Sequence, residues 1–212
     1  HELRTPLAEI RASIEAARRA PADVPATRAP FEASIGAVER MQRAIDALLM
    51  LAQQEAGLAA AALDPLDLVP LLDGLLATLQ PGAQARAILI RRDLPEHLWL
   101  RSDVGALERI LSNLLRNAIE YAPPRSTLTL ALDGAGAAAH LCIANPAPDL
   151  HADDLPRLGQ RFWRKARSGG TAAHAGLGLA LSHALARSLG LQLDFHLRAG
   201  TLQARLGPLP LL

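Results

Sequence analysis

Hydrophobic positions at the start of the chain recur with helical spacing. Over residues 1–20 the apolar positions advance by four, three, four and three residues, with Glu and Arg between them. This heptad rhythm predicts an amphipathic helix. The segment "APADVPATRAP" (20–30) interrupts it, and a similar stripe then resumes, so two helices are expected to form an αα-hairpin. The stripes consist of Leu3, Leu7, Ile10, Ile14 and Ala17, then of Phe31, Ile35, Val38, Ile45, Leu49 and Ala52.

A hairpin of two helices cannot bury both sides of its apolar stripe alone. Pairing with a second copy completes a four-helix bundle, so the pattern favours a homodimer. The alternative is that the hairpin packs on the second half of its own chain.

The pattern changes after "AGLAAAALDP" (56–65), a low-complexity stretch interpreted as a linker. The predicted elements that follow are a helix at 67–79, strands at 87–94 and 98–103, a helix at 104–121 with Asp103 as N-cap, strands at 127–134 and 139–145, a helix at 177–190, and strands at 191–197 and 200–206. Helices mixed with mostly antiparallel strands indicate an α+β fold in which helices cover one sheet. The predicted domains are therefore 1–57 (helical hairpin), 58–66 (linker) and 67–212 (α/β sandwich).

Composition narrows the functional classes. The 22 basic and 21 acidic residues give a net charge of +1, which argues against a nucleic-acid partner. The single cysteine, Cys142, fits a reducing compartment and is expected to be buried because it alternates with core residues on a strand. No apolar run is long enough to span a membrane. Since the sequence does not begin with Met, we interpret it as a fragment whose membrane segment, if any, lies upstream.

Two asparagines on the helix at 104–121 are candidates for metal chemistry. Asn113 and Asn117 are four residues apart and share one face beside the buried stripe. Neutral carboxamide oxygens suit a hard cation such as Mg²⁺ that is held mostly by water and phosphate. Taken alone, the two residues are better explained as solvated surface residues.

Gly176 and Gly178 stand immediately before the helix at 177–190, where backbone N–H groups and the helix dipole favour an anion. The preceding stretch, "RLGQRFWRKARSGG" (157–170), is basic and contains no acid. Together they predict a flap over a nucleotide, although an ordinary basic surface loop gives the same pattern.

The order of four short motifs is more specific than any one of them. "HELRTP" (1–6), "NLLRNA" (113–118), "RFWRK" (161–165) and "GLGLAL" (176–181) resemble the H-box, N-box, F-box and second glycine box of the two-component histidine kinases. The resemblance covers essentially the whole chain. It implies a dimerisation and histidine-phosphotransfer hairpin, followed by an ATP-binding sandwich of the Bergerat type shared with gyrase and Hsp90.

The resemblance also implies roles for the first motif. His1 is the phospho-acceptor, Glu2 its general base, and Thr5 orients the water that dephosphorylates the partner. Pro6 bends the helix beside the acceptor. An imidazole with a pKa of about 6.5 is largely neutral at cytoplasmic pH and therefore nucleophilic.

For the second domain the resemblance implies ATP and Mg²⁺ as cofactors. Asn117 coordinates the metal, Asn113 supports the phosphates, and the glycines allow the flap to hinge. The implied nucleotide-binding residues are Asn113, Asn117, Tyr121, Asn145, Arg164, Gly176, Leu177 and Gly178.

The sequence departs from the family in the first glycine box, which normally reads Asp-x-Gly-x-Gly. In "IANPAPDL" (143–150), Asn145 replaces the Asp, Ala147 the first Gly and Asp149 the second. An amide oxygen accepts a hydrogen bond from the adenine amine more weakly than a carboxylate does. Glu120 stands where the family commonly has a basic residue. We therefore expect real but weakened ATP binding.

These observations predict a sensor histidine kinase core that autophosphorylates on His1 and passes the phosphoryl group to an aspartate of a response regulator. It is expected to act also as a phosphatase of that regulator, and to be the cytoplasmic portion of a bacterial inner-membrane protein. The alternative is a dimeric scaffold, biased to phosphatase activity or without catalysis, that binds nucleotide weakly.

Overall fold

The computed structural model describes residues 38, 45, 48–50, 52, 62–163, 165 and 176–212. His1, Glu2, Thr5 and Arg164 lie outside these residues, and so does most of the predicted hairpin. The described positions between 38 and 52 are helical, as the sequence predicts for the second helix. Met50 packs against the core of the following domain, as expected if the hairpin contacts its own chain. The dimer stays a prediction.

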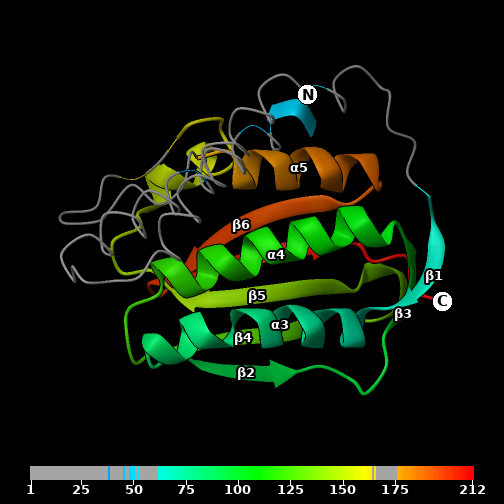
Figure 1. The fold of residues 1–212 in the computed structure, drawn as a ribbon, viewed down its shortest axis with the longest axis horizontal. Helices are drawn as coiled ribbons and strands as arrows, with labels where there is room; N and C mark the ends of the chain where they lie inside the picture. The colour runs from blue at the N-terminus through cyan, green and yellow to red at the C-terminus, as the bar shows by residue number, and fades with distance from the viewer. Residues whose placement is uncertain are drawn as a thin grey trace, which may run out of the picture.

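A five-stranded sheet is the frame of the described domain (Figure 1). Its strands lie in the order β2-β4-β5-β7-β6, with β2 parallel to β4 and the other neighbours antiparallel. Strands β1 and β3 form a separate antiparallel pair. The elements are β1 Asp64–Asp67, α3 Leu68–Ala85, β2 Leu89–Asp93, β3 Trp99–Ser102, α4 Val104–Tyr121, β4 Thr127–Asp133, η2 Gly136–Ala138, β5 His140–Pro146, η3 Ala152–Arg157, α5 Gly178–Ser188, β6 Gln192–Arg198 and β7 Thr201–Gly207.

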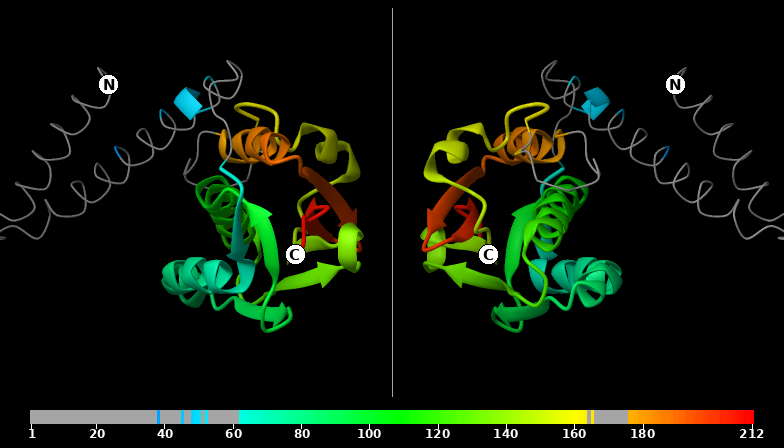
Figure 2. Two further views of the ribbon diagram at one scale, coloured as in Figure 1. Left: turned by 90° about the vertical axis from the view of Figure 1, so that its right-hand side faces the viewer. Right: turned by 90° about the vertical axis from the view of Figure 1, so that its left-hand side faces the viewer.

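Helices α3, α4 and α5 cover one face of the five-stranded sheet (Figures 1 and 2). The sheet contributes alternate residues to the core, such as Leu141 and Ile143 of β5, because successive side chains point to opposite faces. None of the helices in the described part of the chain is both long and apolar enough to cross a bilayer. The predicted α/β sandwich is confirmed, and so is the buried stripe of α4: Leu107, Ile110, Leu111, Leu114 and Ala118.

Aspartates begin two of these helices. Asp103 accepts a hydrogen bond from the backbone N–H of Ala106 at 2.9 Å, which confirms it as the N-cap of α4. Asp67 caps α3 by accepting from Val69 at 3.1 Å, and it also accepts from Leu98 at 2.9 Å. The bond from Leu98, followed by that from His97, holds the pKa of Asp67 below its usual value. Asp67 therefore fixes the start of α3 against the segment that leads into β3.

Two elements differ from the sequence prediction. Helix α3 continues past Pro81 to Ala85, where the sequence predicts an end at 79. Pro81 is exposed and removes only one backbone bond, whereas Ala83 in the next turn is buried in the core. Strand β1 begins at Asp64, inside the predicted linker, because Asp64 pairs with Ser102 of β3. The end of the predicted linker is thus part of the sandwich.

Cys142 lies half-buried on the sheet face away from the helices. It alternates with Leu141 and Ile143, which face the core, so its expected place in the core is wrong. Partial burial raises the pKa of the thiol.

Candidate functional site

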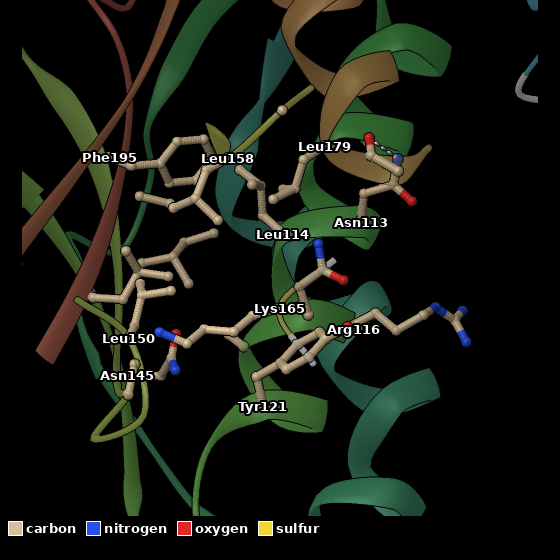
Figure 3. Close-up of a pocket in the computed structure, with 18 of the residues that line it drawn as sticks. Asn113, Leu114, Arg116, Tyr121, Asn145, Leu150, Leu158, Lys165, Leu179 and Phe195 are labelled. Carbon is tan, nitrogen blue, oxygen red and sulfur yellow. Dashed lines mark hydrogen bonds between the residues drawn. The ribbon is translucent and has the colours of Figure 1, made fainter. Parts of the chain in front are cut away.

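A cavity of about 170 Å³ opens between α4, the end of β5, the segment 147–163 and the start of α5 (Figure 3). It brings together six residues that the sequence assigns to nucleotide binding: Asn113, Asn117, Tyr121, Asn145, Gly176 and Gly178. Leu177 does not line the cavity. Its side chain is buried in the core, so only its backbone, at the N-terminus of α5, is available for the predicted role.

The two asparagines of α4 differ in their contacts. Asn117 is half-buried, lines the cavity and makes no hydrogen bond with the described part of the chain. Asn113 donates its amide hydrogens to the carbonyl oxygen of Gly178 at 3.3 Å and to the Ser182 hydroxyl at 3.4 Å. Asn113 thus ties α4 to the first turn of α5, while Asn117 offers its amide to a ligand.

The N-terminus of α5 faces the same cavity. Its N-cap, Leu177, provides no side-chain hydrogen bond, so the first N–H groups of the helix have no side-chain cap among the described residues. Gly178 and Leu179 line the cavity at this turn. Unpaired N–H groups at the positive end of a helix dipole form an anion site.

Gly176 holds the two sides of the cavity mouth together. Its carbonyl oxygen accepts a hydrogen bond from the N–H of Phe162 at 3.0 Å. Its φ is +72°, and an added Cβ would lie 2.8 Å from the backbone carbon of Phe162 and 2.9 Å from the carbonyl oxygen of Trp163. Only glycine fits both the conformation and the space.

Asn145 ends β5 as one of the few buried polar residues of the described chain, with 4% of its surface exposed. Its amide nitrogen donates to the carbonyl oxygen of Pro146 at 3.0 Å. One of the two amide hydrogens is used in this bond, and Oδ1 accepts no hydrogen bond from the described residues, so it is available as an acceptor in the cavity.

Ala147, Pro148, Asp149 and Leu150 form a tight turn after β5. The N–H of Leu150 donates to the carbonyl oxygen of Ala147 at 3.0 Å, with Pro148 and Asp149 as the central residues. Asp149 does not have a positive φ. A turn of this kind favours proline at its first central position and does not require glycine at its second. The loss of the family glycine at 149 is therefore compatible with the backbone.

The rest of the lining is largely apolar, from elements on both sides of the sandwich. Tyr121 lies at the end of α4 opposite Asn145 and Leu150, while Leu158, Leu179 and Phe195 close the other end (Figure 3). Sequence patterns give no signal for Leu158 or Phe195, because neither belongs to a motif. An apolar slot with a few polar groups at its ends suits a planar base.

Two cationic side chains also line the cavity. Arg116 lies within the "NLLRNA" segment, and Lys165 within the basic segment, but neither was among the predicted site residues. Lys165 forms an ion pair with Asp154 of η3, which lowers the pKa of that carboxyl group. Trp163, next to it in the lining, is covered by Arg157, whose guanidinium lies 5.3 Å from the ring centroid.

His183 of α5 supports the cavity wall from behind. Its ring lies edge-on to Phe195, with 5.5 Å between the centroids. It lies so close to Gly159 that an added Cβ there would be 2.3 Å from its Cδ2. Burial, followed by the charge of Arg187, lowers the pKa of His183.

This donor set fits a nucleotide with a bound magnesium ion. The side-chain amide of Asn117 and the first turn of α5 line the same cavity, so metal and phosphate groups are expected between them. No group of three or more His, Cys, Asp or Glu side chains gathers in the described residues to hold a metal by protein ligands alone. A cation at this site is therefore expected to rely on phosphate and water for most of its ligands.

Two family models match the sequence. The His Kinase A (phospho-acceptor) domain matches residues 1–57, and the histidine kinase-, DNA gyrase B- and HSP90-like ATPase matches residues 102–206. Together they account for the helical hairpin and most of the sandwich.

Curated relatives are similar over most of this chain. The signal transduction histidine-protein kinase BaeS of Escherichia coli is 30% identical over 183 residues, which are 85% of this chain and 38% of the relative. The sensor histidine kinase TrcS of Mycobacterium tuberculosis is 32% identical over 197 residues, 89% of this chain and 38% of the relative. The chain thus spans about two fifths of the length of these relatives.

Solved structures share the fold. Full-length ShkA in complex with AMPPNP superposes with a TM-score of 0.78 at 22% identity, covering 100% of this chain and 45% of that one. The Acinetobacter baumannii histidine kinase AdeS gives a TM-score of 0.70 at 17% identity, covering 97% and 95%.

Proposed function

Because the chain belongs to the two-component sensor histidine kinases, we propose that it transfers the γ-phosphoryl group of Mg·ATP to His1 and then to an aspartate of a response regulator. Nε2 of His1 attacks the γ-phosphorus and forms the N–P bond. The bond from that phosphorus to the bridging oxygen breaks, its electron pair leaves with ADP, and the Nδ1 proton passes to Glu2. The second transfer breaks the N–P bond and forms an acyl phosphate on the regulator.

The single observation that carries this proposal is that the side chain of Asn117 and the N-terminus of α5 line the same cavity. The amide of Asn117 makes no hydrogen bond within the described chain, and the first turn of α5 has no side-chain cap. A metal ion and a polyphosphate are the ligands that such a pair binds best. Phosphoryl transfer depends mainly on positioning and charge neutralisation, which these groups supply.

The base is expected in the apolar slot between Tyr121 and β5. Asn145 presents its amide oxygen there, and an acceptor at that place suits the exocyclic amine of adenine. Arg164 is proposed to contact the phosphates from the basic segment. The hairpin is proposed to dimerise, to present His1 to the ATP domain and to dock the receiver domain of the regulator, with Thr5 serving dephosphorylation.

Incubation with γ-³²P-ATP and Mg²⁺ tests the proposal. We expect label that is lost in acid and stable in base, as a phosphoramidate is, and that moves to a receiver domain when one is added. His1→Gln should abolish the label while nucleotide binding remains. Acid-labile label that persists in His1→Gln would show that the acceptor is wrongly assigned.

The alternative is a scaffold biased to phosphatase activity, favoured by the carboxylate of Asp149 and the amide of Asn145 where the family has glycine and aspartate. Titration with Mg·ATP separates the kinase from the scaffold, because the scaffold is expected to bind the nucleotide more weakly than the kinase does. Thr5→Ala should spare autophosphorylation and lengthen the lifetime of the phosphorylated regulator. In the full-length protein, we propose that this chain is the cytoplasmic portion of a bacterial inner-membrane sensor.

A further inference from the structure

Asp149 is the only acidic side chain that lines the cavity among the described residues. It is exposed, and its side chain makes no hydrogen bond or ion pair with the described part of the chain. A carboxylate without a partner beside an apolar slot is an unused acceptor. The family pattern has a glycine at this position, so the resemblance assigns the side chain no role.

The turn fixes the backbone position of Asp149. Leu150, the next residue, lies beside Asn145 and across the cavity from Asn113 and the start of α5 (Figure 3). The hydrogen bond from Leu150 to Ala147 at 3.0 Å holds Asp149 at this end. We therefore expect the negative charge at the base end of the cavity, across from the first turn of α5. A carboxylate near that turn would repel the phosphates proposed to bind there.

Asn145 and Asp149 both line the cavity and lie four residues apart, on either side of Ala147. The amide nitrogen of Asn145 donates one of its two hydrogens to the carbonyl oxygen of Pro146, and Oδ1 accepts no hydrogen bond from the described residues. The 6-amino group of adenine has two N–H donors, and its neighbour N1 is an acceptor. Two acceptors at one end of the slot match a base with two N–H donors on one nitrogen.

We propose that Asp149 is a specificity-determining residue that accepts the second hydrogen of the adenine 6-amino group, beside Asn145, and so selects nucleotides that carry this amine. The inference rests on the proposed function, because it concerns the base of the same nucleotide. A charged acceptor forms a stronger hydrogen bond than a neutral one, so this selection depends on the carboxylate.

Comparison of ATP with purine riboside triphosphate, which lacks only the 6-amino group, tests the proposal. We divide the dissociation constant of purine riboside triphosphate by that of ATP. This ratio measures the preference for the 6-amino group, because the repulsion between Asp149 and the triphosphate is the same for both nucleotides and cancels. We expect the ratio to fall by about tenfold in Asp149→Ala and by about fivefold in Asp149→Asn, since a hydrogen bond to a charged group contributes more than one to an amide. Asp153→Asn, an exposed carboxylate of η3 outside the cavity lining, is the control and should leave the ratio unchanged.

The outcomes separate this inference from the function it rests on. If the unsubstituted chain binds ATP but both variants keep its ratio, the inference alone is overturned. If Asp149→Ala weakens GTP more than ATP, the carboxylate faces the guanine N1–H and 2-amino edge, and the assignment to the 6-amine is wrong. Failure of the unsubstituted chain to bind ATP would overturn the proposed function and the inference together.

Discussion

The backbone N–H of Phe162 donates to the carbonyl oxygen of Gly176 at 3.0 Å, and both residues have positive φ, +64° and +72°. This bond joins the end of the segment that follows η3 to the residues that lead into α5. Because Gly176 also lines the cavity, the bond couples the shape of the cavity mouth to a backbone contact that only glycine permits.

We therefore predict that Gly176→Ala weakens both folding and nucleotide binding. The left-handed conformation costs alanine about 1 kcal/mol, and the clash with the Phe162 and Trp163 backbone adds to it, so the free energy of unfolding should fall by about 2 kcal/mol or more. Gly190→Ala is a matched control, since its φ is also +72° and nothing lies within 4 Å of the added Cβ. Urea unfolding and ATP titration of both variants measure the difference. Equal losses in the two would show that the contact with Phe162 does not matter.

Alanine substitution should affect nucleotide binding at Asn117 and folding stability at Asn113. Asn117→Ala removes no hydrogen bond within the described chain, so its unfolding free energy should stay within about 0.5 kcal/mol of the original. Its affinity for ATP in Mg²⁺ should fall to the affinity measured in EDTA. Asn113→Ala breaks the tie to Gly178 and Ser182 and should lose about 1 kcal/mol of stability. Calorimetric titration with ATP, with and without Mg²⁺, measures the Mg²⁺ dependence of the affinity. If this dependence is unchanged in Asn117→Ala, Asn117 does not bind the metal.

His183 should make stability depend on pH. Burial and Arg187 lower its folded pKa, an effect that Asp194 partly opposes. Below a pH of about 6.5, the unfolded chain takes up a proton on His183 more readily than the folded chain does. The contribution of His183 to stability is therefore complete above that pH, and it decreases as the pH falls toward the lowered pKa of the folded state. His183→Gln should flatten the unfolding free energy between about pH 7 and pH 5. His196 follows Phe195 on β6 and points to the opposite face of the strand from the ring that His183 contacts, so His196→Gln should leave the pH dependence of the unfolding free energy unchanged. If His183→Gln also leaves it unchanged, the pH dependence belongs to another group.

The sequence predicts the elements whose signals are local. The 3.6-residue stripe of α4 and its Asp103 cap follow directly from the pattern, and the strand pairs follow from alternation and turns. The sequence does not predict strand β1, because this short strand is defined by its pairing with β3, which lies on the other side of helix α3 in the chain. Helix α3 extends past Pro81 because tertiary burial of Ala83 outweighs the local cost.

For the candidate site, too, the sequence predicts the residues that belong to local motifs and misses those that only the fold brings together. Asn113, Asn117, Asn145, Gly176 and Gly178 belong to motifs, and the structure collects them around one cavity. The apolar wall comes from residues without a motif, which only the fold brings together. The role proposed for Asp149 could not be predicted from the sequence. Whether an aspartate can replace the family's glycine depends on the backbone, and only the structure shows that the φ of Asp149 is not positive and that the residue lies in a turn.

The final prediction concerns Asn145→Asp, for which binding and stability should change in opposite directions. A carboxylate accepts from the adenine amine more strongly than an amide, so the preference for ATP over purine riboside triphosphate should rise by about fivefold. The same change removes the donor that Asn145 extends to the Pro146 carbonyl oxygen at 3.0 Å and introduces a charge at a residue only 4% exposed. The free energy of unfolding should therefore fall by about 1–3 kcal/mol.

Asn145→Ala separates these two effects. It also loses the bond to Pro146, but it introduces no charge and offers no acceptor, so stability and base preference should both decrease. If Asn145→Asp is less stable and yet prefers ATP no more than the original chain does, the side chain holds the end of β5 without facing the base. The alignment of residues 143–150 with the first glycine box would then be wrong, and the base would have to be recognised without Asn145.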